Sequence, residues 1–150
     1  MSNQTAVNFG FPRTMVAETS HWLVLVRPKQ PTFGSLILVC KEPVQAFSDV
    51  SPEAFADLQV AIKGIERLLQ DKVKYEKINY LMLMMVDPDV HFHVIPRYAG
   101  VRDHAGMSFP DAGWPGPPAL GTAVDLSDDT LEALAQAWRR AAVGRWRISG

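Results

Sequence analysis

Short apolar runs alternate with polar segments along the first part of the chain. The runs HWLVLVRP (residues 21–28) and SLILVCKEP (residues 35–43) are separated by KQPTFG, which contains Pro31 and Gly34. Two short apolar segments joined by such a turn are typical of a β-hairpin. The pattern therefore predicts two antiparallel strands here.

The next segment, residues 50–72, changes to a helical period. Ser51 can cap a helix and Pro52 suits its first position. Apolar side chains then recur at spacings of three and four, which indicates an amphipathic helix. Its predicted apolar face consists of Phe55, Leu58, Ile62, Ile65 and Leu69.

Two further apolar runs follow this helix. They are INYLMLMMV (residues 78–86) and VHFHVIPRY (residues 90–98), with the turn DPD around the junction. Their lengths and the tight turn predict neighbouring antiparallel strands. We expect the first to be buried on both faces, with the methionines of its second half packed in the core.

The last third of the chain divides into two parts. Residues 99–126 are rich in glycine and proline and show no periodicity, so they predict a long irregular loop, which is usually functional or disordered. A cap at Ser127 and acidic residues after it predict a C-terminal helix over residues 127–147. Its buried face would carry Leu131, Leu134 and Trp138.

Together these elements, in the order ββαββα, predict an α+β domain with an antiparallel sheet and two helices. A length of 150 residues suits one domain over residues 1–150, with a core at about residues 20–98, and 47% hydrophobic residues suffice for that core. The sequence contains none of the glycine-rich nucleotide-binding loops and no G-x-S-x-G elbow.

The amino-acid composition limits the kinds of partner and the cellular location that we expect. Fifteen basic and sixteen acidic residues give a net charge of -1, so we expect neither nucleic acid nor a membrane as a partner. The N-terminus lacks the features of a signal peptide, and no apolar run reaches the roughly 18 residues of a membrane span. The single cysteine, Cys40, suits a reducing compartment, and we expect a cytoplasmic protein.

The segment VDPDVHFHVIPRY (residues 86–98) carries the candidate chemistry. Side chains alternate along a strand, so residues 90, 92 and 94 would face the core. The opposite face would then carry Asp89, His91 and His93. At neutral pH one imidazole can attack as a nucleophile while its neighbour donates a proton, and a nearby guanidinium can neutralise a phosphate. This combination fits nucleophilic catalysis at phosphorus.

Two other interpretations of the histidine pair stay open. His91 and His93 could be structural side chains satisfied by backbone or water, or they could chelate zinc. The further zinc ligands would have to come from elsewhere, and His21 and His104 stand in no recognisable ligand spacing. We therefore expect no metal site.

The segment HFHVIPRY, with the helix and hairpin before it, resembles the histidine-triad (HIT) superfamily, whose signature is His-φ-His-φ-His-φ-φ with φ apolar. The three triad positions correspond to Asp89, His91 and His93. The likeness covers roughly residues 22–97 and, more weakly, the WPGP tail of some bacterial members. The chain thus resembles a divergent bacterial-type member with aspartate in place of the first triad histidine.

The resemblance implies a homodimer whose subunits join their sheets. It also implies a nucleotide hydrolase or nucleotidyl transferase that attacks the α-phosphorus of a nucleoside phosphate derivative, such as a dinucleoside polyphosphate or phosphoramidate. His91 would be the nucleophile that forms a nucleotidyl-histidine intermediate, and His93 would bind the phosphate and assist proton transfer. No metal or other cofactor is generally required.

Five further residues are expected to contact or shape the substrate site. Asp89 places a carboxylate beside it, Ser35 stands where the family often has histidine, and Arg27 replaces the group that commonly holds ribose. Arg97 is expected to bind phosphate, and Trp114 to anchor SFPDAGWPGPPALG over the site of its own or the other subunit. Because the triad is incomplete, the alternative is a non-catalytic nucleotide- or phosphometabolite-binding protein of the same fold.

Overall fold

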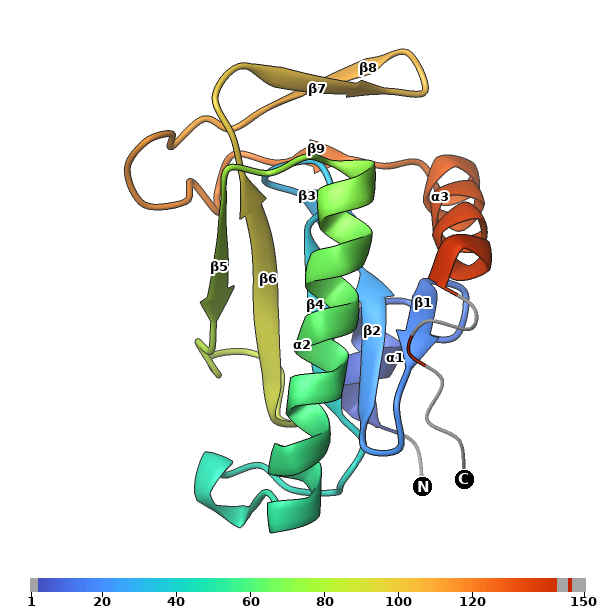
Figure 1. Ribbon diagram of the computed structural model, residues 1–150, viewed down its shortest axis with the longest axis vertical. Coiled ribbons are helices and arrows are strands. Elements are labelled where there is room, and N and C mark those ends of the chain that lie inside the picture. The colour runs from blue at the N-terminus through green and yellow to red at the C-terminus, as the bar shows by residue number, and fades with distance from the viewer. Residues whose placement is uncertain (1–2, 143–145, 147–150) are drawn as a thin grey trace.

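A five-stranded antiparallel sheet forms the centre of the structure, a computed structural model that describes residues 3–142 and 146 (Figure 1). Neighbouring strands of the sheet lie in the order β1 (Met15–Glu18), β2 (Trp22–Val26), β4 (Leu36–Cys40), β6 (His91–Arg97) and β5 (Lys77–Leu81). All four pairings are antiparallel. The α+β class with an antiparallel sheet, predicted from the sequence, is confirmed.

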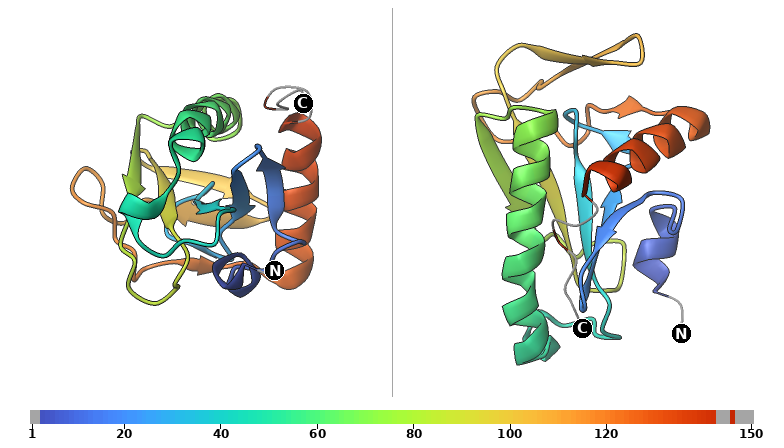
Figure 2. Two further views of the ribbon diagram at one scale, coloured as in Figure 1. Left: turned by 90° about the horizontal axis from the view of Figure 1, so that it is seen from below. Right: turned by 45° about the vertical axis from the view of Figure 1, so that its right-hand side comes forward.

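Helices cover both faces of this sheet and one of its edges. The long helix α2 (Pro52–Lys72) and the short helix α1 (Gln4–Asn8) lie on opposite faces, as the view from below shows (Figure 2). The helix α3 (Asp128–Ala142) runs beside β1. Within the described part of the chain, no helix has the length and apolar character needed to cross a membrane.

The smaller elements lie outside the central sheet. They are the 3-10 helix η1 (Phe47–Asp49) and two two-stranded sheets, which pair β3 (Lys29–Gln30) with β9 (Val124–Asp125) and β7 (Val101–His104) with β8 (Met107–Pro110). Three of these strands lie in residues 99–126, which we expected to be an irregular loop. That expectation was wrong because the turn between β7 and β8 is formed by Ala105 and Gly106, both with positive φ, which closes a tight hairpin.

The predicted hairpin and the predicted helix after it are both present. In the β2–β4 pair, Trp22 lies opposite Cys40 and Val26 opposite Leu36. The Ser51 hydroxyl accepts a hydrogen bond from the backbone N–H of Ala54 and so caps α2, with proline at the start of the helix. These elements followed from local signals alone.

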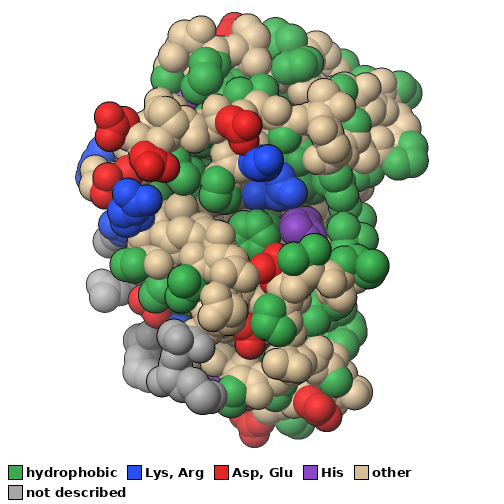
Figure 3. All heavy atoms as spheres, turned by 180° about the vertical axis from the view of Figure 1, so that it is seen from behind, with side chains coloured by type: hydrophobic (Ala, Val, Ile, Leu, Met, Phe, Trp, Pro, Cys, Tyr) green, Lys and Arg blue, Asp and Glu red, His purple; other side chains and the backbone are tan. Residues whose placement is uncertain are grey.

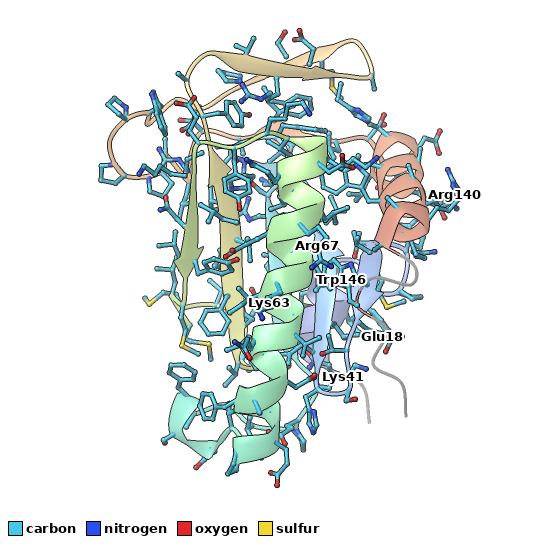
Figure 4. All side chains as sticks on the ribbon, in the orientation of Figure 1. Glu18, Lys41, Lys63, Arg67, Arg140 and Trp146 are labelled. Atoms are coloured by element: carbon cyan, nitrogen blue, oxygen red, sulfur yellow. The ribbon has the colours of Figure 1, made fainter. Side chains whose placement is uncertain are left out.

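The buried face of α2 agrees with the predicted one only in part. Its buried side chains include Ala54, Ala61 and Ile65, whereas Phe55 is 41% exposed. The helix packs through small residues: a Cβ on Gly64 would lie 2.3 Å from the Trp146 ring, which rests against α2 (Figure 4). Of the predicted face, Ile65 and Leu69 are therefore in the core, whereas Phe55 lies outside it.

The strand β5 is shorter and more exposed than predicted. It ends at Leu81, and the chain then turns through Met84, whose φ is 52°. Met85 is 83% exposed and Val86 is 90% exposed, so burial on both faces is wrong. The reason is that the chain leaves the sheet after Leu81, so both residues belong to the connection to β6, and β5 itself is an edge strand with only β6 beside it. Of the methionine run, Met82 and Met84 do pack against the core.

The two ends of the chain also differ from the predictions. The segment before residue 21, for which we predicted no element, contains α1 and β1. The C-terminal helix is present, Ser127 caps it through the N–H of Thr130, and its predicted face is buried. Residues 143–145 and 147 of the predicted helix lie outside the described residues.

Candidate active site

Strand β6 presents alternate side chains to the two faces of the sheet, as predicted. Phe92 and Val94 belong to the core beneath α2 and α3. His91 lies opposite Val39 and His93 opposite Ile37, which belong to the apolar cluster beneath α1. The two histidines therefore lie on the α1 face, above a floor of buried aliphatic side chains.

The imidazole of His91 has a defined tautomer when it is neutral. Its Nδ1 lies 2.7 Å from the backbone carbonyl oxygen of Asp89. A carbonyl oxygen only accepts hydrogen bonds, so Nδ1 carries the proton and Nε2 keeps its lone pair. This is the tautomer that a nucleophile attacking through Nε2 needs. The residue is only 2% exposed.

The second imidazole, His93, lies close to the first and is neutral at pH 7. The ring centroids are 5.2 Å apart, with an interplanar angle of 71°. Burial is the main cause that lowers the pKa of His93 from 6.5 to about 4; the neighbouring Arg27 and His91 lower it further, and Asp87 acts in the opposite direction. The Nδ1 atom of His93 is buried, and the described residues offer it no hydrogen-bond partner.

Arg27 supplies a positive charge to this neighbourhood. It directly follows β2, and its Nη1 donates to the Lys29 carbonyl oxygen at 2.6 Å. Its Nε is buried and has no partner in the described part of the chain. The space-filling view from behind shows a histidine at the surface beside basic side chains (Figure 3). Unpartnered polar groups on Arg27 and His93 favour an anionic ligand.

The titration of His93 tests this electrostatic picture. Its ring signals in an NMR titration are expected to have a midpoint near 4, and Arg27→Met should raise that midpoint because it removes a positive charge. The unfolded chain binds the proton near 6.5, so the depressed pKa contributes stability that is lost as pH falls from about 6.5 through 4. A midpoint at or above 6.5 would contradict the arrangement.

The carboxylate of Asp89 binds the backbone of α1. The N–H of Thr5 donates to its Oδ2 at 3.0 Å, and its own N–H donates to Thr5 Oγ1 at 2.9 Å. Phe9, just after α1, has its ring centroid 6.3 Å from that of His91 and 6.2 Å from that of His93. Sequence reasoning missed Thr5 and Phe9. The one local signal was Asn3, which caps α1 through the N–H of Ala6.

The structure places Arg97 differently from the sequence-based expectation. Its guanidinium binds both carboxylate oxygens of Asp111, at 2.7 and 3.1 Å. Its remaining hydrogen bonds go to Asn79 Oδ1 and to the carbonyl oxygen of Gly116. Arg97 is 4% exposed, so it holds the 111–116 loop and has no free face for phosphate. Arg27 takes the expected phosphate-binding role in the proposal below.

Ser35 has no free hydroxyl for a ligand, and Trp114 lies apart from the histidines of its own chain. Ser35 is fully buried, and its hydroxyl is engaged by the N–H and the carbonyl oxygen of Thr32. Trp114 belongs to the 111–116 loop, whose anchor at Arg97 is six residues, or about 20 Å, along β6 from His91. Within one chain the structure therefore brings together His91, His93, Asp89 and Arg27.

No group of three or more His, Cys, Asp or Glu side chains in the described ranges could hold a metal ion. The two histidines of β6 thus have each other but no third ligand of these types beside them in that part of the chain.

Comparison with known proteins gives a family and a fold. The sequence pattern of the HIT domain family matches residues 10–100. No curated protein matches the chain in sequence. A histidine-triad protein from Sinorhizobium meliloti is 21% identical, has a TM-score of 0.70, and aligns over 95% of this chain and 96% of its own.

Two further solved structures share this fold. A histidine-triad protein from Bradyrhizobium japonicum is 24% identical with a TM-score of 0.64, over 84% of this chain and 87% of its own. The diadenosine triphosphate hydrolase of Plasmodium falciparum, in complex with cyclomarin A, is 13% identical with a TM-score of 0.63, over 87% of this chain and 76% of its own. At these identities the likeness shows the fold.

Proposed function

Because the chain belongs to the HIT domain family, we propose that it is a nucleotide hydrolase or nucleotidyl transferase acting at the α-phosphorus of a nucleoside phosphate derivative. Dinucleoside polyphosphates and nucleoside phosphoramidates are the expected substrates. The observation that carries the proposal is the hydrogen bond from His91 Nδ1 to the Asp89 carbonyl oxygen, which leaves Nε2 as a nucleophile.

In the proposed reaction, Nε2 of His91 attacks the α-phosphorus. A phosphorus–nitrogen bond forms while the bond from phosphorus to the leaving oxygen or nitrogen breaks. The bound phosphate raises the low pKa of His93, so this imidazole can hold the proton that the leaving group takes. Water or another acceptor then attacks the phosphorus, the phosphorus–nitrogen bond breaks, and the proton of the attacking group passes to His93.

Arg27 is the proposed phosphate ligand, in place of Arg97. Arg27→Met keeps most of the aliphatic stem and removes the guanidinium. It should weaken binding of nucleoside monophosphate by about tenfold, because a charge-assisted contact is lost, and leave binding of the bare nucleoside nearly unchanged. Calorimetry with both ligands measures the difference. Equal losses for the two ligands would remove Arg27 from the phosphate site.

The alternative function is nucleotide binding without turnover. It is favoured by one observation: His91 is 2% exposed and Phe9 lies against both imidazoles. The two functions separate when binding and product release are measured together for a panel of adenylated and guanylated compounds, with and without a chelator. Product release that persists with the chelator supports the enzyme, whereas tight binding with no product supports the binding protein.

We also propose that the protein is a cytoplasmic homodimer joined at the edge strand β5. Support comes from large apolar side chains that are exposed in the segment after this strand, namely Leu83, Met85 and Val86. Phe47 in η1 and Phe55 in α2 are exposed as well. The 111–116 loop lies beside β5 (Figure 1), so Trp114 would reach the partner's site rather than its own. Sedimentation at the mass of a monomer would contradict the dimer.

A further inference from the structure

Three side-chain contacts tie the helix α1 to the rest of the molecule. Asn3 donates from Nδ2 to the carbonyl oxygen of Cys40 at 2.8 Å, and Asn8 donates from Nδ2 to Asp87 at 2.8 Å on the surface. Between them, Thr5 and Asp89 exchange two hydrogen bonds, each through the backbone N–H of one and the side-chain oxygen of the other. Thr5 is fully buried, so water does not compete easily for this central tie.

The position of α1 decides what covers the two imidazoles. Ala6 is buried in the apolar cluster on this face of the sheet, together with Ile37 and Val39, and Phe9 packs against the same cluster. Phe9 is thereby held about equally far from His91 and His93. A helix of five residues is not stable by itself, so its place depends on these tertiary contacts.

The backbone carbonyl group of Asp89 makes a further contact, with the imidazole of His91. Its carbonyl oxygen accepts the Nδ1 proton of His91, two residues along the chain. Its N–H and its carboxylate are both held by Thr5. The residue is therefore fixed on one side by α1, and on the other side it fixes the imidazole.

We propose that Asp89 is a positioning residue, which uses its reciprocal hydrogen bonds with Thr5 to hold α1 over the histidines and to keep its carbonyl oxygen on His91 Nδ1. The consequence for catalysis rests on the proposed function. The clamp itself, meaning the two reciprocal hydrogen bonds between Thr5 and Asp89, does not depend on that function. The carboxylate at this position thus has a structural partner, because its Oδ2 accepts the amide proton of Thr5.

Four variants test the clamp. Asp89→Ala removes the carboxylate, Asp89→Asn keeps an oxygen that can accept from the Thr5 N–H, and Thr5→Val removes Oγ1 while keeping the shape of the side chain. Asn8→Ala is the matched control, since it removes an exposed tie from the same helix to the same turn. Urea unfolding first confirms that each variant is folded.

Two measurements on the histidines need no substrate. In Asp89→Ala and Thr5→Val, diethyl pyrocarbonate should modify His91 and His93 about tenfold faster than in the wild type, because losing the clamp favours opening of α1. Rates at His21 and His104 should not change. In ¹⁵N NMR spectra, the Nδ1 proton of His91 should exchange with water about tenfold faster in Asp89→Ala, with substantial rescue in Asp89→Asn. Asn8→Ala should stay within about twofold of the wild type.

With a substrate, kcat should fall by about tenfold in Asp89→Ala while KM changes less, because the variant misplaces the nucleophile. Folded Asp89→Ala and Thr5→Val proteins with wild-type labelling and wild-type Nδ1 proton exchange would overturn the clamp. Wild-type protein that shows the clamp by both histidine measurements, yet turns over no nucleotide, would support the clamp and count against the proposed function. The two proposals can therefore fail separately.

Discussion

Replacing His91 by alanine is expected to lower kcat/KM by at least about a thousandfold. The imidazole is the proposed nucleophile, and removing the nucleophile of a covalent mechanism typically costs this much or more. The same change should remove every trace of a covalent intermediate. His93→Ala should slow turnover by about a hundredfold, the usual range for a lost proton-transfer group, and leave some intermediate detectable. Steady-state kinetics on the best substrate of the panel measure both effects.

His104→Ala is the matched control for these two variants. This imidazole stacks on Phe33, with ring centroids 5.1 Å apart, and belongs to the β7–β8 hairpin rather than to β6. Its loss should leave kcat/KM within about twofold of the wild type, since it carries no part of the proposed chemistry. A folded His91→Ala protein that turned over substrate like the wild type would exclude His91 as the nucleophile.

The second large effect is on stability. Asp111→Ala is expected to reduce the free energy of unfolding by about 3–5 kcal/mol, because it leaves the guanidinium of Arg97 buried without its counter-charge. The carboxylate also accepts the backbone N–H of Tyr98 at 3.2 Å, so that donor loses its partner as well. Urea unfolding monitored by circular dichroism measures the change.

Two comparisons show whether charge burial is the cause. Asp103→Ala removes an exposed carboxylate of β7 that accepts from Ser108 Oγ, and it should change stability by no more than about 0.5 kcal/mol. The double variant Arg97→Met, Asp111→Leu should be less destabilised than Asp111→Ala, because no unpaired charge remains inside. An Asp111→Ala protein as stable as Asp103→Ala would show that the buried pair does not hold the 111–116 loop.

Elements encoded by local signals could be predicted from the sequence. The β2–β4 hairpin and the cap of α2 follow from turn residues and a serine–proline start, which act within a few residues of the chain. The alternation along β6 likewise follows from the geometry of a strand, so the placement of His91 and His93 on one face could be predicted from the sequence.

What could not be predicted depends on contacts between distant segments. Thr5 and Asp89 are 84 residues apart in the chain, and α1 has too few residues to show a helical period. Arg97 is a plausible phosphate ligand until Asp111, in a segment without periodicity, is found to bind it. The buried face of α2 was predicted only in part, because close packing at Gly64 by Trp146, a residue from the other end of the chain, adds small residues that an apolar pattern does not show.

The central claim is a nucleotidyl group carried by His91, and one measurement tests it most directly. The protein is mixed with an adenylated substrate, quenched during turnover at a pH that preserves phosphorus–nitrogen bonds, and analysed by intact mass and peptide mapping. We predict a mass increase of one adenylyl group, located on Nε2 of His91, that disappears as the substrate is consumed. Rapid turnover with no adduct at any quench time, or an adduct on another residue, would contradict the claim.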